Sequence, residues 1–136
     1  MATIESIGHE LKKRKETVKL ARSISDFANT AGADKETQDF LWNKYQSLLQ
    51  AYGALELILE QLGSSAIELQ RAAEWRSIGL YHTHVIEAMK LSHPDWSERA
   101  LALLHQELID KATKQQDIAM AEMTRLLTKA EPYLSS

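Results

Sequence analysis

The sequence predicts an all-α protein, an antiparallel up-down-up-down four-helix bundle with a long C-terminal helix. Ala, Leu, Glu, Lys and Gln dominate the composition, and these are strong helix formers. Val18 and Val85 are the only valines, and no segment alternates apolar and polar residues as a strand does. Because 136 residues is the length of one domain, we expect a single helical-bundle domain over residues 1–136.

The first helix is predicted over residues 3–29, where apolar residues recur every three or four positions. That spacing places on one face Ile4, Ile7, Leu11, Val18, Ala21, Ile24 and Ala28. Residues 30–34 interrupt the pattern, and Gly32 suits a left-handed turn between two helices.

The second helix, predicted over residues 35–62, has the clearest periodicity. Its seven-residue repeat consists of Leu41, Leu48, Leu55 and Leu62, with Tyr45, Tyr52 and Leu59 at the intervening positions. Such a seam packs knobs into holes against neighbouring helices. Gly63 followed by Ser64 and Ser65 predicts the end of this helix and a cap for the next one.

The third helix is predicted over residues 66–91 and the fourth from about 95 to 131. Ser92 and Pro94 are suited to the cap and first turn of the fourth helix. At 1.5 Å per residue the fourth helix would be about 55 Å long, and residues 113–117, which hold no apolar side chain, could bend it. Short loops between long helices make neighbours antiparallel.

Charge and cysteine content exclude several classes of protein. The net charge of -3 argues against a protein whose whole surface binds the phosphates of a nucleic acid. The chain has no Cys, which excludes disulfides, thiolate metal sites and cysteine nucleophiles. No stretch reaches the roughly 18 apolar residues that span a bilayer. We therefore expect no membrane partner, a cytoplasmic location and no cofactor.

The second helix carries few charges, which indicates a protein–protein interface. From residue 40 to residue 55 the one charged side chain is Lys44. The expected interface residues are Phe40, Trp42, Leu49 and Gly53, because aromatic and uncharged groups are typical of an interface core. We expect Trp42→Glu or Leu49→Glu to give a monomer with unchanged helical content. The alternative is that this helix is the most buried of the four and needs no partner.

Polar and aromatic residues in the predicted third helix indicate a second candidate site. A ligand pocket between helices, where bundles bind ligands, would use Trp75, Gly79, His82 and Ile86. Gly79 costs about 1 kcal/mol in a helix interior relative to Ala, which suggests close approach of another helix or a ligand. The alternative is that His82 is a hydrogen-bonded core histidine.

Arg76 and His82 are separated by five residues, a spacing that resembles the Arg-x4–6-His signature of HEPN-type ribonucleases. Members of that family are small helical bundles that work as dimers. The resemblance implies that Arg76 and His82, with Tyr81 beside them, would meet at a dimer cleft and act on an RNA 2′-hydroxyl and phosphate. The polar residue that the family commonly has after the arginine is matched only loosely by Ser77 in this chain.

Two further groups of residues are weaker candidates. His84 and Glu87 share a helix face, and an antiparallel fourth helix would bring His105 to the same level, a ligand set suited to Zn or Fe. Lys12, Lys15, Lys19 and Arg22 form a basic ridge on the first helix, which we interpret as a solvated face.

The sequence therefore favours a non-enzymatic interaction or regulatory protein that acts through helix–helix contacts. We expect it to be a homodimer or small homo-oligomer, with a further protein as a second kind of partner. The alternative is a HEPN-like ribonuclease or a small-ligand-binding bundle that uses the region of Arg76 and His82.

Overall fold

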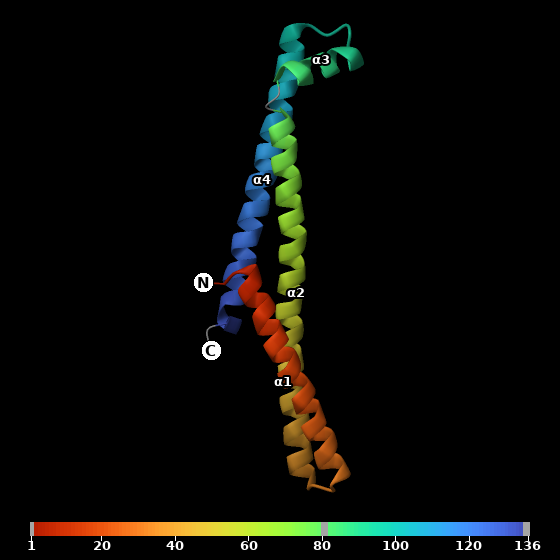
Figure 1. Cartoon of the computed structure of the whole chain (residues 1–136), viewed down its shortest axis with the longest axis vertical. Coiled ribbons are helices and arrows are strands. Elements are labelled where there is room, and N and C mark those ends of the chain that lie inside the picture. The colour runs from red at the N-terminus through yellow and green to blue at the C-terminus, as the bar shows by residue number, and fades with distance from the viewer. Residues whose placement is uncertain (1, 80–81, 135–136) are drawn as a thin grey trace. The chain divides into compact units, whose positions relative to one another are not determined.

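The chain folds into four α-helices, and the prediction of an all-α helical bundle is confirmed (Figure 1). The computed structural model describes residues 2–79 and 82–134, with only the backbone for residues 82 and 83. The helices are α1 (Ile4–Thr30), α2 (Lys35–Gly79), α3 (His82–Ser92) and α4 (Glu98–Leu134), and no strand occurs in these ranges.

The first helix and its turn follow the prediction. Thr3 caps α1, since its hydroxyl accepts a hydrogen bond from the Ser6 backbone N–H at 3.0 Å. Gly32 has a φ of 74°, the left-handed conformation expected of the residue that turns the chain toward α2. Thr3 and Gly32 therefore determine where this helix begins and where the chain reverses.

The predicted helix end at Gly63 is wrong, because α2 continues without a break to Gly79. Gly63 has a negative φ and is part of the helix. A glycine in a helix costs about 1 kcal/mol of free energy relative to Ala. Burial of Leu62, Ser65 and Ala72 continues the helical period across it. The predicted third helix is consequently divided, its first part belonging to α2 and its last part forming the short α3.

The fourth helix begins three residues later than predicted and does not break at residues 113–117. Its start is capped by Ser97, whose hydroxyl accepts a hydrogen bond from the Ala100 N–H at 3.2 Å. The segment before it is a short turn in which the His93 and Trp96 rings stack with centroids 4.1 Å apart. Ser92 therefore ends α3 and does not cap α4.

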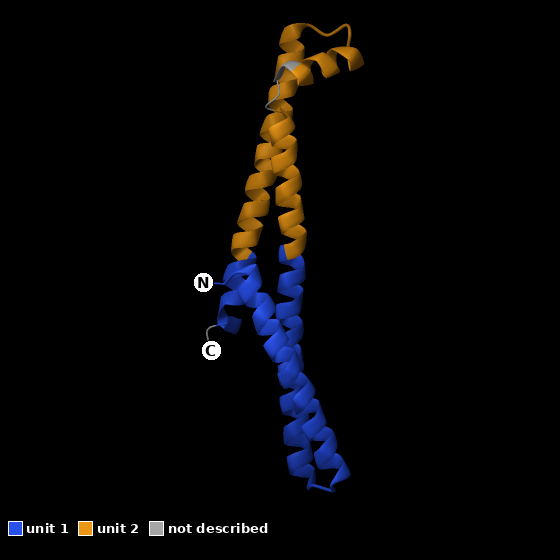
Figure 2. Cartoon of the chain, viewed as in Figure 1, with its two compact units in different colours: residues 1–62, 126–136 blue, residues 63–125 orange. Residues whose placement is uncertain are grey.

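The helices form two compact units (Figure 2), one comprising Met1–Leu62 with Leu126–Ser136 and the other Gly63–Arg125. Both α2 and α4 contribute to each unit. The prediction of a single domain stays a prediction.

The core of the first unit is concentrated where three helices meet. Its buried residues there come from the start of α1, the middle of α2 and the end of α4, and they include Ile7, Leu11, Leu55, Ile58, Leu62, Leu126 and Ala130. Two hydrogen bonds join the ends of the chain: the Ala2 N–H donates to Glu131 at 2.7 Å, and Arg14 donates to the Tyr133 carbonyl at 2.8 Å. The leucine seam predicted in α2 thus faces its neighbours, with Leu55 and Leu62 fully buried.

The second unit is built from the end of α2, α3 and most of α4. Its buried positions are Ser65, Ala72, Leu101, His105, Ala112 and Ala119. Several of these are small, which lets helices approach closely but buries little apolar surface. Large side chains such as Leu91 and Leu103 are left exposed.

Candidate functional site

The hairpin of α1 and α2 is one candidate site, because much of its apolar surface is uncovered. Beyond the three-helix core, the hairpin consists of two helices, and its buried residues are Ser25, Ala28 and Tyr45. The exposed fractions of its large apolar residues are 73% for Phe27, 68% for Phe40, 61% for Leu20, 44% for Ile24, 41% for Trp42 and 38% for Leu49. Two helices packed on each other can cover only their facing stripes.

Arg22 marks one side of this hairpin. Its guanidinium lies over the Trp42 ring at 5.6 Å and the Tyr45 ring at 5.4 Å, and it donates a hydrogen bond to the Tyr45 hydroxyl at 3.4 Å. The pKa of Arg22 is raised, mainly by this hydrogen bond to Tyr45 and secondly by the negative charge of Asp26. The guanidinium therefore stays protonated. Trp42 is thus partly covered from within its own chain.

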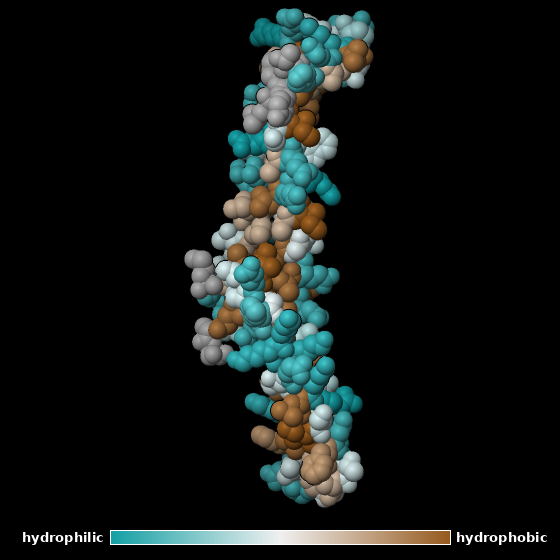
Figure 3. All heavy atoms as spheres, in the orientation of Figure 1, coloured by the Kyte–Doolittle hydropathy of each residue, from teal (hydrophilic) through white to brown (hydrophobic). Residues whose placement is uncertain are grey.

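The opposite side of the hairpin carries a larger apolar surface. Leu20, Ile24 and Phe27 are four and three residues apart and share one face of α1. Leu20 is two residues from Arg22, and Phe40 is two residues from Trp42, so both point about 160° away from the Arg22 side. We name Leu20, Ile24, Phe27 and Phe40 the hairpin patch. Figure 3 shows hydrophobic side chains gathered on this hairpin.

The predicted interface residues are therefore all exposed but do not share one face. Gly53 is exposed as well, and it lies with Trp42 and Leu49, whereas Phe40 belongs to the hairpin patch. The exposure of these residues goes against the alternative that this helix is simply the most buried one. The sequence interpretation placed Ile24 on the core face and overlooked Leu20 and Phe27, although their spacing was visible in the sequence.

The basic ridge of α1 lies toward the Arg22 side of the hairpin, away from the hairpin patch. Lys12, Lys15 and Lys19 are exposed, as expected of a solvated face.

On α2, the pKa of Tyr52 is raised, first by loss of solvent and then by its hydrogen bond to the Glu56 carboxylate and the charge of that group. Tyr52 is therefore a neutral hydrogen-bond donor at physiological pH.

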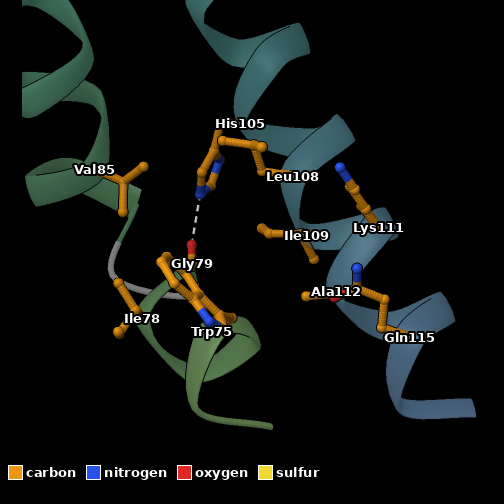
Figure 4. A pocket seen from close by; sticks show the side chains of 10 residues that line it. All are labelled: Trp75, Ile78, Gly79, Val85, His105, Leu108, Ile109, Lys111, Ala112 and Gln115. Carbon is orange, nitrogen blue, oxygen red and sulfur yellow. Dashed lines mark hydrogen bonds between the residues drawn. The ribbon is translucent and has the colours of Figure 1, made fainter. Parts of the chain in front are cut away.

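The other candidate site is a cavity of about 320 Å³ in the second unit (Figure 4). Helix α2 contributes Trp75, Ile78 and Gly79 to its wall, α3 contributes Val85, and α4 contributes His105, Leu108, Ile109, Lys111, Ala112 and Gln115. The wall is mainly apolar. Its polar side-chain groups are the Trp75 indole N–H, Lys111, Gln115 and His105, and the His105 Nε2–H donates to the Gly79 carbonyl at 2.5 Å.

Gly79 allows α2 and α4 to approach at this cavity. A Cβ atom at position 79 would lie 2.9 Å from Cγ1 of Ile109, closer than real Cβ contacts. The close approach that the sequence suggested for this glycine is thus present at the last described residue of α2.

The predicted pocket residues are only partly brought together. Trp75 and Gly79 line the cavity, whereas Ile86 is half-buried on α3 and is not part of the wall. The side chain of His82 lies outside the described residues. The α4 residues of the wall were missed, because only the fold shows which turn of α4 faces α2.

The ribonuclease alternative gains no geometric support. Arg76 is exposed on α2, and Tyr81 and the His82 side chain lie outside the described residues. The candidate metal ligands are not brought together, since His84, Glu87 and His105 make no metal-binding group in the part of the chain that the structure describes. His84 and Glu87 are exposed, whereas His105 is buried against Gly79.

Comparison with protein-family models, with curated proteins and with solved structures finds no match to this chain. Among the described residues, no helix combines the length and the apolar character needed to span a membrane.

Proposed function

We propose that this chain is a non-enzymatic, cytoplasmic interaction protein that acts through helix–helix contacts and self-associates through its α1–α2 hairpin. One observation carries the proposal, namely that the hairpin exposes six large apolar side chains over two packed helices. An exposed apolar surface of this kind marks an interaction site. Helices with an uncovered apolar stripe are stabilised when a further helix packs on it.

The oligomeric state of the unmodified chain tests this proposal. We expect native mass spectrometry and sedimentation equilibrium at micromolar concentration to give a multiple of 15.4 kDa. Dilution should shift the population toward the monomer, because the contact is made between separate chains. A monomer at every concentration would contradict the proposal, since the exposed residues would then have no copy to cover them.

A second candidate function is the binding of a small apolar ligand, which the cavity in the second unit favours. The cavity is within the size range of ligand pockets and mainly apolar. Ala112 is buried in its wall, so Ala112→Leu should fill part of the space. Ala102→Leu, at an exposed position of the same helix, is the matched control.

For this candidate we expect a native mass spectrum of the purified protein to show a small-molecule adduct. The adduct should be lost in Ala112→Leu and kept in Ala102→Leu. An adduct kept in both variants would place the ligand elsewhere, and a bare protein in every preparation would count against ligand binding.

A further inference from the structure

The cavity in the second unit adjoins a second pocket. The two share Trp75 of α2 and Gln115 of α4 in their walls. The second pocket has a volume of about 330 Å³ and is lined in addition by Glu68, Arg71, Ala72 and Ile118. Because both pockets are bounded by the same two helices, they follow one another along one side of the α2–α4 pair.

The end of the cavity away from the second pocket is apolar. Its wall there consists of Ile78, Val85, Leu108 and Ile109 (Figure 4). Two of these side chains are largely open to solvent, since Ile78 is 57% and Leu108 is 49% exposed. An apolar group that covered them would remove their surface from water, which is favourable.

The charged groups closest to the shared part of the two pockets are cationic. Among the described residues, Lys111 is the only lysine, arginine or acidic residue in the cavity wall, and Arg71 lies one turn of α2 from Trp75. Neither cation has an ion-pair partner in the part of the chain that the structure describes. Glu68 lies one turn beyond Arg71, at the end of the second pocket away from the cavity.

The acidic side chains near these cations in the sequence line neither pocket. Glu74 and Glu107 are both exposed and are absent from the two walls. Lys111 and Gln115 are one turn apart and share a side of α4, and the Gln115 amide can donate hydrogen bonds. A negatively charged group in the shared part would therefore be close to two cations, Lys111 and Arg71, and to an amide donor.

We propose that the cavity binds a small aliphatic carboxylate, with its apolar chain against Ile78 and Leu108 and its carboxylate at Lys111 and Gln115. The aliphatic stem of a lysine can lie along an apolar wall while its ammonium stays at the opening. There it donates a charge-assisted hydrogen bond to the carboxylate, and Arg71 adds a second positive charge. The inference rests on the second candidate function, the binding of a small apolar ligand, and specifies the chemical class of that ligand.

Three probes of equal carbon number test the charge of the bound group. At neutral pH octanoate is negative, 1-octanol is uncharged and octylammonium is positive, while their apolar chains are alike. Isothermal titration calorimetry of the unmodified chain should show octanoate binding about fivefold more tightly than 1-octanol, the size expected of one partly exposed ion pair. Octylammonium should bind most weakly. Equal affinities for the three probes, or tightest binding of octylammonium, would overturn the inference.

Two lysine variants assign this preference to a side chain. Lys111→Met and Lys114→Met each remove one positive charge from an exposed position of α4, but Lys114 lines neither pocket. We expect Lys111→Met to lose most of the preference for octanoate over 1-octanol and Lys114→Met to keep it. Equal losses in the two variants would mean that net charge attracts the carboxylate, and they would overturn the role of Lys111.

The same titrations separate failure of the inference from failure of ligand binding. Ala112→Leu should weaken all three probes, whereas Ala102→Leu should leave them unchanged, because only the first substitution fills the cavity. Binding of 1-octanol that equals or exceeds binding of octanoate would overturn the inference and leave the binding of apolar ligands intact. Failure of all three probes to bind the unmodified chain would contradict the candidate function itself, and the inference with it.

Discussion

Replacing Leu62 by alanine is expected to lower the free energy of unfolding by about 2–5 kcal/mol. Leu62 is fully buried in the first unit, where a few large side chains, among them Ile7, Leu55 and Leu126, make the core. Removing its side chain loses the favourable free energy of transferring the buried atoms from water to the core, and it leaves a cavity. Because typical domains are stable by only 5–15 kcal/mol, this loss is a large fraction of the total.

The matched control is Leu57→Ala on the same helix, where the side chain is 53% exposed. Both variants exchange leucine for alanine in a helix, so their intrinsic helix propensities change alike. We expect the control to cost less than about 1 kcal/mol. Urea unfolding followed by circular dichroism at one fixed protein concentration measures both losses. Equal losses would contradict the assignment of Leu62 to the core.

The second large effect is expected for Gly79→Val, which should lower the free energy of unfolding by about 1–3 kcal/mol. The new Cβ would begin 2.9 Å from Ile109 Cγ1, so the Ile109 side chain or the helix that carries it would have to shift at the cavity. A shift of the helix would also strain the hydrogen bond from His105 to the Gly79 carbonyl.

Gly63→Val provides the control for this second prediction. Gly63 is an exposed helical position with no atom near the added Cβ, and valine has a slightly better helix propensity than glycine. Thermal unfolding should therefore show little change or a small gain for Gly63→Val and a clear loss for Gly79→Val. Matching losses would mean that the glycine at position 79 is not needed for helix contact.

The exposed apolar surface of the hairpin was predicted only in part. The low charge of residues 40–55 indicated an uncovered face on α2, and Phe40 and Trp42 are exposed there. That this face is an interface stays a prediction. The α1 half of the surface was missed, since the stripe containing Ile24 was interpreted as core. A three- and four-residue spacing shows which residues share a face but not whether that face is covered.

The sequence by itself determined the helical class, the α1–α2 turn at Gly32 and the face of α2 that packs through Leu55 and Leu62. These features depend on helix propensity, local φ and periodicity, which neighbouring residues carry. Only the tertiary structure decided that α2 continues through Gly63, because burial on both sides of a glycine can outweigh its cost of about 1 kcal/mol. The α4 wall of the cavity, like the exposure of the hairpin patch, depends on which helices pack together, and no local pattern determines that.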